Sequence, residues 1–459
     1  MDNDISGDDS LGWALPPSLW ELPEELALAD KFLNDLRLLK PLARCLDLEH
    51  GRPSLPVAQV LRLFYLKEQY RLSDEVLIKE VSDSIHWRRF CHFGLVDKMP
   101  NPSALSKWRH RLGADGIRKV NRAITLKLRE KKVLRGRKIR IDSTVVDADI
   151  HYPTDSGLIA DGVKRLTRLG KQIQSTVGKT VTPVHDRSRS VKRKLLGIGK
   201  LLRRRSGDAV QEVRKVTEEL AKIGERQGRV VSQLCEEAHD RLTRLRGEAR
   251  GRAERLLQKA SQARHLLGTV IVQSRRVTAG DKHIKDRVVS LSDPDARPIK
   301  KGKLGQTVQF GYKVQLVEGE KGFVTDYTTE HGNPPDVDAL VPALDRHNSV
   351  FGRYPDTVAT DRAFSSFPNE EKCRERGIRV VAIPRRGRRS EERIAEEHSR
   401  SFRRANRWRS GIEARISVLK RRYGMRRSRY RGQERVAMGV GLSIFAYNTS
   451  RWVRVTQAA

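Results

Sequence analysis

The 459-residue sequence contains no apolar run that approaches the roughly 18 residues a membrane span requires, and it has only four cysteines. Cys45, Cys91, Cys235 and Cys373 are far apart, with neither a CxxC pair nor the Cys/His spacing of a zinc site. The acidic start, MDNDISGDDS, lacks the basic and apolar regions of a signal peptide. These absences predict a reduced, cytoplasmic protein without a structural zinc ion.

Two common catalytic motifs are also missing. There is no GxSxG segment, and Ser143 has no evident histidine partner, so a nucleophilic serine is not expected. There is no GxxxxGK[ST] loop, so nothing in the sequence supports the use of ATP.

Acidic residues are scarce relative to basic ones. The chain has 92 Lys and Arg against 57 Asp and Glu, which gives a formal net charge of +35. An excess of this size points to a polyanionic partner, most simply nucleic acid, and we expect the protein to associate with the nucleoid. Affinity for such a partner should fall steeply with salt.

The first segment, residues 1–131, is predicted to be a helical DNA-binding domain. Several amphipathic stretches lead to a short basic helix that starts near Pro102 and ends at Gly113. Its cations, Lys107, Arg109 and Arg111, suggest DNA contact from a helix-turn-helix-like unit. The alternative is a small helical domain that only packs on the rest of the chain.

A strand is predicted over residues 139–146, within a first core segment at 132–160. Asp142 lies in the middle of this apolar, β-branched stretch, where a buried and unpaired carboxylate is costly. A metal ion, a turn, or a salt bridge to Arg140 or another cation would each account for it. Asp147, Asp149 and Asp155 are competing carboxylates in the loop that follows, and His151 is more simply a polar loop residue than a ligand.

A basic insert is predicted at residues 161–280. From about residue 209 its apolar positions recur at steps of three and four, which predicts a long helix or a helical hairpin with coiled-coil-like packing. The preceding basic stretch, SRSVKRKLLGIGKLLRRRSG, either contacts the DNA backbone or is a solvated helix face.

The remaining segment, 281–459, alternates between predicted strands and helices. Strands are expected at DRVVSLS (286–292), in TVQFGYKVQLVE, in GFVTDYTTEHG, in TVATDRAF up to Asp361, and in RVVAIP. A basic run with Arg385 and Arg386 then leads to a helix, and an apolar C-terminal helix should dock on the core. The predicted fold class is therefore multidomain, α + α/β, with a mixed sheet interrupted by the helical insert.

The helix over Arg409–Lys420, RSGIEARISVLK, holds one carboxylate between two cations. At about 100° per residue, Arg409, Glu413 and Lys420 lie within roughly 40° of one another, beside an apolar stripe. Alone, this pattern is typical of a basic surface helix with intrahelical ion pairs. With Asp142 and Asp361 on strands, Glu413 would complete a set of oxygen ligands of the kind that Mg²⁺ prefers.

This arrangement resembles the DDE transposases of bacterial insertion sequences, which have a ribonuclease H-like core. The matching residues are Asp142 in IDSTVV, Asp361 in TVATDRAFSS, and the pattern Y-x2-R-x3-E-x6-K, whose tyrosine position holds Asn406 here. The segment GRPSLPVAQVLRLFYLKEQYRLSDEVL also resembles the N-terminal helical domain of many such enzymes, and HYPTDSGLIADGVKRL resembles a subgroup with a long helical insert.

The resemblance implies a metal-dependent transposase. Asp142, Asp361 and Glu413 would be catalytic and would bind two Mg²⁺ or Mn²⁺ ions, while Arg409, Lys420, Arg385 and Arg386 would contact DNA phosphates. The protein would bind terminal inverted repeats and target DNA as a homodimer or larger assembly, and would cleave and transfer strands. Two rival interpretations are an inactive DNA-binding protein derived from this fold and a ribonuclease H-like nuclease.

Overall fold

The computed structural model describes residues 16, 21–45, 54–178, 180–203, 208–281, 283–303, 306–385 and 387–458. The chain divides into two compact units. One consists of the residues up to Ala148 together with those from Gly311 onward, and the other is Asp149–Phe310. None of the helices in the described ranges is both long enough and apolar enough to cross a bilayer.

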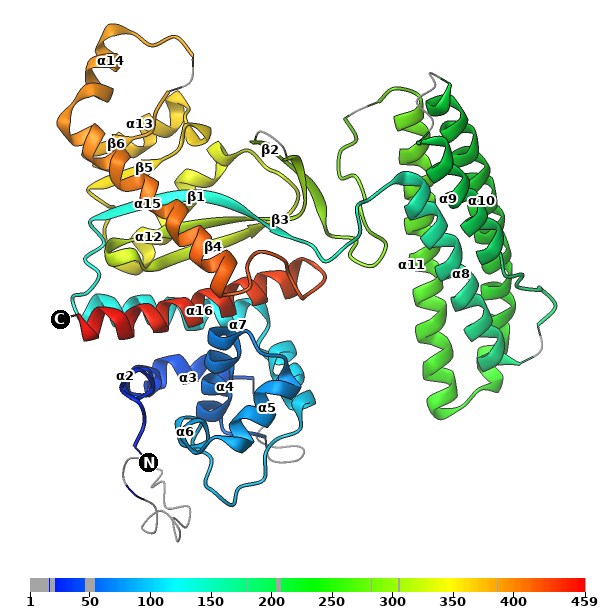
Figure 1. Cartoon of the computed structure of the whole chain (residues 1–459), viewed down its shortest axis with the longest axis horizontal. Coiled ribbons are helices and arrows are strands. Elements are labelled where there is room, and N and C mark those ends of the chain that lie inside the picture. Colours follow the sequence, from blue (N-terminus) through cyan, green and yellow to red (C-terminus); the bar gives the residue numbers. More distant parts are fainter. Residues whose placement is uncertain are drawn as a thin grey trace. The chain divides into compact units, whose positions relative to one another are not determined.

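Among the described residues, the first unit begins with the helices α2 to α7, which Figure 1 shows in blue to cyan. They are α2 (Glu24–Leu33), α3 (Leu36–Ala43), α4 (Val57–Tyr70), α5 (Asp74–Asp83), α6 (Ile85–Phe90) and α7 (Pro102–Glu130). Ser73 caps α5 by accepting a hydrogen bond from the Val76 N–H. The expected break at Gly113 is a kink inside α7, where φ is +58°, a conformation that suits glycine.

A mixed sheet forms the centre of the first unit. Its strands are β1 (Lys138–Asp147), β2 (Arg297–Lys303), β3 (Gln306–Glu318), β4 (Val324–Glu330), β5 (Thr357–Thr360) and β6 (Val380–Ala382). The order is β2-β3-β1-β5-β6, with β4 paired to β3. The pairs β1–β3 and β3–β4 are antiparallel, whereas β1–β5 and β5–β6 are parallel, so the predicted mixed sheet is confirmed. β2 and the start of β3 belong to the second unit.

Helices cover both faces of this sheet. The elements after β3 are η3 (Glu320–Gly322), η4 (Asp336–Ala339), α12 (Leu340–Phe351), η5 (Arg362–Phe364), α13 (Phe367–Glu375), α14 (Glu391–His398) and α15 (Arg400–Arg422). On one face, Leu344 of α12 and Cys373 of α13 belong to the apolar cluster that contains Ile141 and Val358. On the other face, α15 packs against β1, β5 and β6 (Figure 1).

The C-terminal helix α16 (Gln433–Gln457) joins the N-terminal helices to the sheet. It contacts α2, α4, α7 and β4, and most of its central side chains are buried. The Asn448 side-chain amide accepts a hydrogen bond from the Val324 N–H and donates one to the Val324 carbonyl. These bonds satisfy backbone groups at the start of β4, and the predicted docking of this helix on the core is confirmed.

The second unit is built around four helices. They are α8 (Asp155–Val177), α9 (Ser188–Leu201), α10 (Ala209–Arg241) and α11 (Gly247–Thr278), with η2 (Leu242–Arg244) between the last two. Their apolar faces share one buried cluster, which includes Leu166, Leu234 and Leu267. Of the two predicted alternatives, a long helix or a hairpin, the structure shows the hairpin, formed by α10 and α11. Coiled-coil packing stays a prediction.

The strand predicted at residues 286–292 is wrong. This segment is irregular in the described chain, and the Gln273 side chain binds both backbone groups of Val288. The apolar residues Val288 and Leu291 pack into the helical cluster of the second unit, so the alternating pattern reflects burial against helices.

Candidate active site

Strand β1 carries different chemistry on its two faces. Ile139 and Ile141 are fully buried in the apolar cluster beneath α12. Because successive side chains alternate along a strand, Arg140 and Asp142 point to the opposite face. The Arg140 guanidinium donates to the Trp408 carbonyl of α15, which shows that this face is the one α15 covers. The structure therefore places Asp142 on the α15 side of the sheet.

Asp361 follows the neighbouring strand at the same level. β1 and β5 pair in parallel with Ile141 opposite Thr360, and this register, continued by one residue, brings Asp361 beside Asp142. Ala359, two residues before Asp361, packs in the cluster beneath α15, so this face of β5 is the one that α15 covers. Paired strands lie about 4.8 Å apart, so the two aspartates are neighbours on one face.

Glu413 lies on the edge of α15 opposite the one that contacts Arg140. Trp408 and Gly411 of the same helix contact Arg140, which precedes Asp142 by two residues on β1. At 100° per residue, Glu413 is rotated by about 200° from Gly411 and about 140° from Trp408. It therefore belongs to the opposite edge of the helix, where its side chain is exposed.

The three carboxylates differ in how firmly they are held. Asp142 accepts a hydrogen bond from the Ser143 N–H at 2.7 Å, and Asp361 accepts one from the Ala363 N–H at 2.9 Å. The side chain of Glu413 is 67% exposed, and its nearest cation is Arg409 at 3.6 Å. An exposed ion pair at this distance contributes little to stability, so the pair between Arg409 and Glu413 does not account for the presence of Glu413 on α15.

The oxygen donors of this site fit a hard divalent cation in type. Across the described ranges, however, no three Asp, Glu, His or Cys side chains converge closely enough to hold a metal ion. The two aspartates are fixed at adjacent strand positions, whereas Glu413 is exposed on a longer side chain. Glu413 is therefore the residue that would have to turn toward the aspartates for all three to share a ligand.

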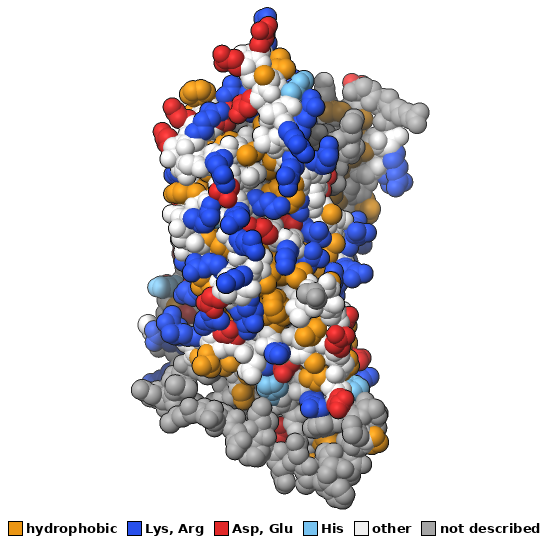
Figure 2. All heavy atoms as spheres, turned by 90° about the vertical axis from the view of Figure 1, so that its left-hand side faces the viewer, with side chains coloured by type: hydrophobic (Ala, Val, Ile, Leu, Met, Phe, Trp, Pro, Cys, Tyr) orange, Lys and Arg blue, Asp and Glu red, His pale blue; other side chains and the backbone are white. Residues whose placement is uncertain are grey.

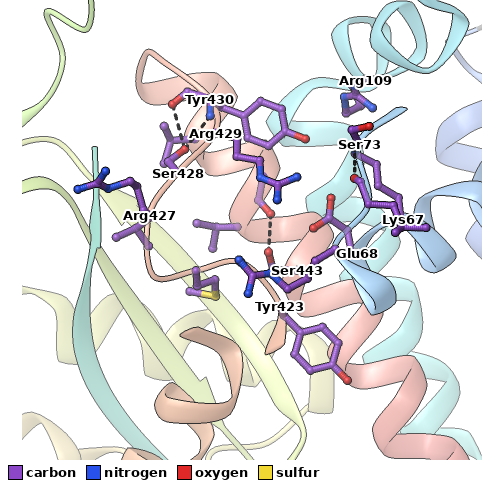
Figure 3. A pocket seen from close by; sticks show the side chains of 18 of the residues that line it. Lys67, Glu68, Ser73, Arg109, Tyr423, Arg427, Ser428, Arg429, Tyr430 and Ser443 are labelled. Carbon is purple, nitrogen blue, oxygen red and sulfur yellow. Dashed lines mark hydrogen bonds between the residues drawn. The ribbon is translucent and has the colours of Figure 1, made fainter. Parts of the chain in front are cut away.

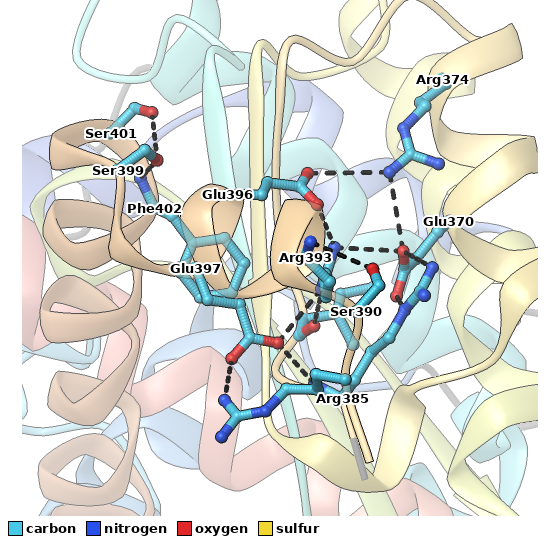
Figure 4. A network of polar contacts seen from close by, with 12 residues as sticks. Glu370, Arg374, Arg385, Ser390, Arg393, Glu396, Glu397, Ser399, Ser401 and Phe402 are labelled. Atoms are coloured by element: carbon cyan, nitrogen blue, oxygen red, sulfur yellow. Dashed lines mark hydrogen bonds and ion pairs between the residues drawn. The ribbon is translucent and has the colours of Figure 1, made fainter. Parts of the chain in front are cut away.

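The predicted phosphate contacts fall in two different environments. Arg409 and Lys420 lie on α15, on the same side of the helix as Glu413. Arg385 instead binds the fully buried Glu370 through its Nε and Nη2 atoms, at 3.1 and 2.8 Å. Figure 4 shows Arg385 and Arg393 converging on Glu370. Arg386 lies outside the described residues.

The basic helix of the N-terminal region presents only part of its predicted surface. Lys107 and Arg111 are exposed. Arg109 is buried and binds the Asp74 carboxylate with both terminal nitrogens, at 2.8 and 2.5 Å. Burial alone would raise the pKa of Asp74, but the hydrogen bonds from Arg109 and Lys67 lower it. Arg109 therefore ties α7 to α5, a position that suits a structural ion pair better than contact with DNA.

The competing candidates for the first carboxylate have other surroundings. The backbone of Asp147, at the end of β1, accepts a hydrogen bond from Ser428 and donates one to Arg426. Asp155 pairs with Arg287 at 2.8 Å within the second unit. Asp149 is exposed. The pairing of β1 with β5 ends at Ile141 and Thr360, so Asp142, and none of these three residues, directly follows it beside Asp361.

A group of buried charges beneath α15 was not anticipated. Glu318 of β3 has no exposed surface, lies opposite Arg140 in the strand pairing, and binds the Arg140 guanidinium. The Arg415 Nε atom of α15 is 3.5 Å from the same carboxylate. Burial raises the pKa of Glu318, against the opposing effect of the two arginines. The sequence signal was a glutamate at the end of an apolar strand; its place opposite Arg140 comes from the strand register.

A cavity of about 280 Å³ lies where α4, α5 and α7 meet the segment between α15 and α16. Figure 3 shows Glu68 and Arg429 turned toward the same space, while Arg427 points away from it. Burial raises the pKa of Glu68 to about 7, although Lys67, Arg109 and Arg429 oppose the shift. Glu68 therefore changes charge near neutral pH.

Basic side chains are widespread on the surface of the protein. Figure 2 shows Lys and Arg distributed over most of the visible face, with smaller groups of acidic residues between them. Exposed arginines of α15 and of the segment after it belong to this surface: Arg403, Arg404, Arg407, Arg421, Arg422, Arg426, Arg427 and Arg429. The second unit contains 36 Lys and Arg against 18 Asp and Glu, so both units share the charge excess.

Comparison with known proteins gives two family matches. Residues 21–111 match the family described as "Transposase domain (DUF772)", and residues 269–449 match the family described as "Transposase DDE domain". The second match contains Asp361 and Glu413 and begins after Asp142.

A relative from Rhizobium meliloti, described as "Uncharacterized protein ORF8 in nfe locus", is 28% identical over 127 residues. The aligned region covers 27% of this chain and 61% of the length of that relative. No solved structure gives a significant match.

Proposed function

The chain belongs to the DDE-type transposases of insertion sequences, and we propose on that premise that it cuts and joins DNA at the ends of its element. It would bind terminal inverted repeats, hydrolyse a phosphodiester to release a 3′-hydroxyl, and join that end to target DNA. The observation that carries the proposal is the placement of Asp142 and Asp361 at adjacent positions of β1 and β5, beneath the helix that bears Glu413.

In the proposed reaction, Asp142, Asp361 and Glu413 hold divalent cations, Mg²⁺ or Mn²⁺. Two such ions, when bound, would activate the attacking oxygen and stabilise the leaving oxygen. The backbone N–H groups of Ser143 and Ala363 orient the aspartates by donating to their carboxylates. In the first step a water oxygen attacks phosphorus and the bond to the 3′-oxygen breaks. In the second step that 3′-hydroxyl attacks phosphorus in a phosphodiester of the target; the new P–O bond forms as the bond to the target's own 3′-oxygen breaks, and that oxygen leaves as a hydroxyl after the attacking hydroxyl has lost its proton to solvent.

The cations near Glu413 would hold the DNA. Arg409 and Lys420 lie on the same side of α15 as Glu413, so they are suited to contact phosphates next to the cut. Lys107 and Arg111 on α7 are exposed and suited to backbone contact. The ribonuclease H-like core, the helix-turn-helix-like unit and assembly as a dimer on DNA are parts of the same proposal.

The test is cleavage of a duplex that carries the element's terminal repeat, measured with Mg²⁺ or Mn²⁺ and without metal. Asp361→Asn and Glu413→Gln should each lower cleavage by roughly 10³-fold or more, because metal-ligand contacts supply several kcal/mol to the transition state. DNA affinity should stay within a few-fold of wild type.

Asp345→Asn is the control, because Asp345 lies on α12, on the opposite face of the sheet, where it pairs with Arg376. Wild-type binding without metal-dependent cleavage would instead indicate an inactive DNA-binding protein. Preference for an RNA–DNA hybrid over duplex DNA would indicate a nuclease.

A further inference from the structure

Three charged side chains meet between the sheet and α15. The Glu318 carboxylate, which is completely buried, binds Arg140 across the β1–β3 pair and lies 3.5 Å from the Nε of Arg415. Arg140 is itself only 5% exposed. The group therefore links β1, β3 and α15 at one point. We call Arg140, Glu318 and Arg415 the Glu318 cluster.

Stability is a poor explanation for such a cluster. Removing charges from water costs several kcal/mol per ion, and an apolar replacement of similar volume is often neutral or stabilising. The pKa of Glu318 is raised by burial in spite of its two arginines, so the cost is not fully offset. The cluster instead fixes the relative position of the elements it joins, because the planar guanidinium of an arginine binds its partners in fixed directions.

Arg140 uses this fork to hold α15 at one place along its length. Its guanidinium donates to the Trp408 carbonyl and lies 4.7 Å from the centroid of the Trp408 ring. It also occupies the space next to Gly411, where any side chain would collide with it. Sliding or rotating α15 would break all of these contacts together.

On both β1 and α15, a residue of the Glu318 cluster lies close in sequence to a proposed catalytic residue. Arg140 precedes Asp142 by two residues on the same face of β1, and Arg415 follows Glu413 by two residues on α15. The contacts of the cluster therefore fix the distance between the strand that carries one carboxylate and the helix that carries another.

We propose that Glu318 is a positioning residue, which holds Arg140 and Arg415 so that α15 presents Glu413 to Asp142 and Asp361. This inference rests on the proposed function of those three carboxylates. It assigns to Glu318 no contact with metal or DNA. Its effect is on the placement of Glu413, and hence on how well the site takes up its metal ions.

The principal variant is Glu318→Gln, which keeps the shape of the side chain and removes its charge. Cleavage of terminal-repeat DNA is measured across a Mn²⁺ titration, together with DNA affinity. Loss of a residue that orients metal ligands costs about 10–100-fold in metal affinity or activity. We expect a loss of that size, a midpoint shifted to higher Mn²⁺, partial rescue at saturating metal, and unchanged DNA affinity.

Asp326→Asn is the matched control. Asp326 is a carboxylate of the same sheet, on β4, but it pairs with Arg346 of α12 at 2.6 Å. It should change stability without moving the Mn²⁺ midpoint. Equal midpoints in wild type and Glu318→Gln, or equal shifts in Glu318→Gln and the control, would overturn the proposal.

Hydrogen exchange separates the positioning role from the proposed chemistry. In Glu318→Gln the amides of residues 405–416 should exchange faster than in wild type, whereas those of α10 and α11 should not change. This readout needs no cleavage, so a wild-type protein that fails to cut DNA would refute the proposed function and leave the positioning role decided by exchange alone. Unchanged exchange in α15 would overturn the positioning role.

Arg415→Met is a second variant for the case in which Glu318→Gln does not fold. It removes the contact from the helix and leaves the Arg140–Glu318 pair in place. The same shift of the Mn²⁺ midpoint and the same faster exchange in α15 are expected, in smaller measure. Wild-type values for both would count against the proposal.

Discussion

On one face of the central sheet, β1 contributes Ile139 and Ile141 to an apolar cluster with α12; on the other, it contributes Arg140 and Asp142 beneath α15. The same ten-residue strand therefore serves two purposes at alternate positions. Full burial of an isoleucine contributes about 1.5–3 kcal/mol to folding, whereas a buried charge costs free energy unless it is paired.

The difference between the two faces of β1 shows which residues of the sheet are not explained by their contribution to stability. The α12 face has the composition expected of a core. The α15 face holds Asp142, Glu318 and Asp361 close to a helix rich in arginine, an arrangement that suits binding of cations and phosphates better than folding. Substitutions on the two faces should consequently be separable, with stability lost on one and activity lost on the other.

The largest effect should come from Asp142→Asn. We expect DNA cleavage to fall by roughly 10³-fold or more, because a proposed metal ligand is lost, with little change in thermal stability or DNA affinity. Single-turnover cleavage and a melting curve on the same preparation check this. If the variant cut DNA within tenfold of wild type, Asp142 would not be a catalytic residue. The two faces of β1 would then not differ in their contribution to activity.

Ile141→Ala, at the adjacent position, should have the opposite profile. Its side chain is fully buried among α12 and strand residues, so truncation should lower the free energy of unfolding by about 2–5 kcal/mol. Cleavage per folded molecule should stay close to wild type at a temperature below the transition. Urea denaturation gives the first quantity, and a cleavage assay normalised to the folded fraction gives the second.

Gly411→Ala should show how closely α15 must approach the sheet. The added methyl group would meet the Arg140 guanidinium, which Glu318 and Trp408 hold in place, so the helix must shift by a fraction of an ångström. We expect cleavage to fall by roughly tenfold because the catalytic geometry changes, with a smaller effect on stability. Gly268→Ala is a suitable control, since that helical glycine has open space around it.

The smallest effect concerns pH on the α12 side. His347 is buried against Phe351, with its Nε2 atom 3.1 Å from the Gly136 carbonyl, and burial lowers its pKa below the usual 6.5. Below pH 6.5 the unfolded chain binds a proton that the folded chain does not, so stability should be lost as pH falls. Denaturation at pH 7.5 and 5.5 measures this loss, and His347→Gln should reduce it.

Much of this architecture follows from local patterns in the sequence. The β-branched stretch around Asp142, the strand that ends before Asp361, and the stripe of α15 predicted their elements, because alternation and helical periodicity are local properties. The C-terminal helix was predicted for the same reason. Residues 286–292 were misread because burial against helices can imitate the pattern of a strand. Helix α14, which follows the basic run, was missed, although Ser390 caps it.

The pairing of charges could not be predicted in this way. Arg109 belongs to a basic helix in the sequence, but its partner, Asp74, is 35 residues away. Glu318 lies 178 residues from Arg140, and the second unit separates them in the chain. Which arginine meets which carboxylate depends on the tertiary fold, so the Glu318 cluster became visible only with the sheet register.

The register of β1 and β3 has a further consequence for how the chain could be shortened. Asp147 lies directly opposite Gly311, so Asp149–Phe310, which itself contributes β2 and the start of β3 to the sheet, connects facing positions of one antiparallel pair. In topological terms the second unit is an enlarged hairpin loop. A two-residue turn is a common connection between such strands. A chain in which a short turn replaces the helices α8–α11 would therefore test what the helical bundle contributes to the proposed reaction.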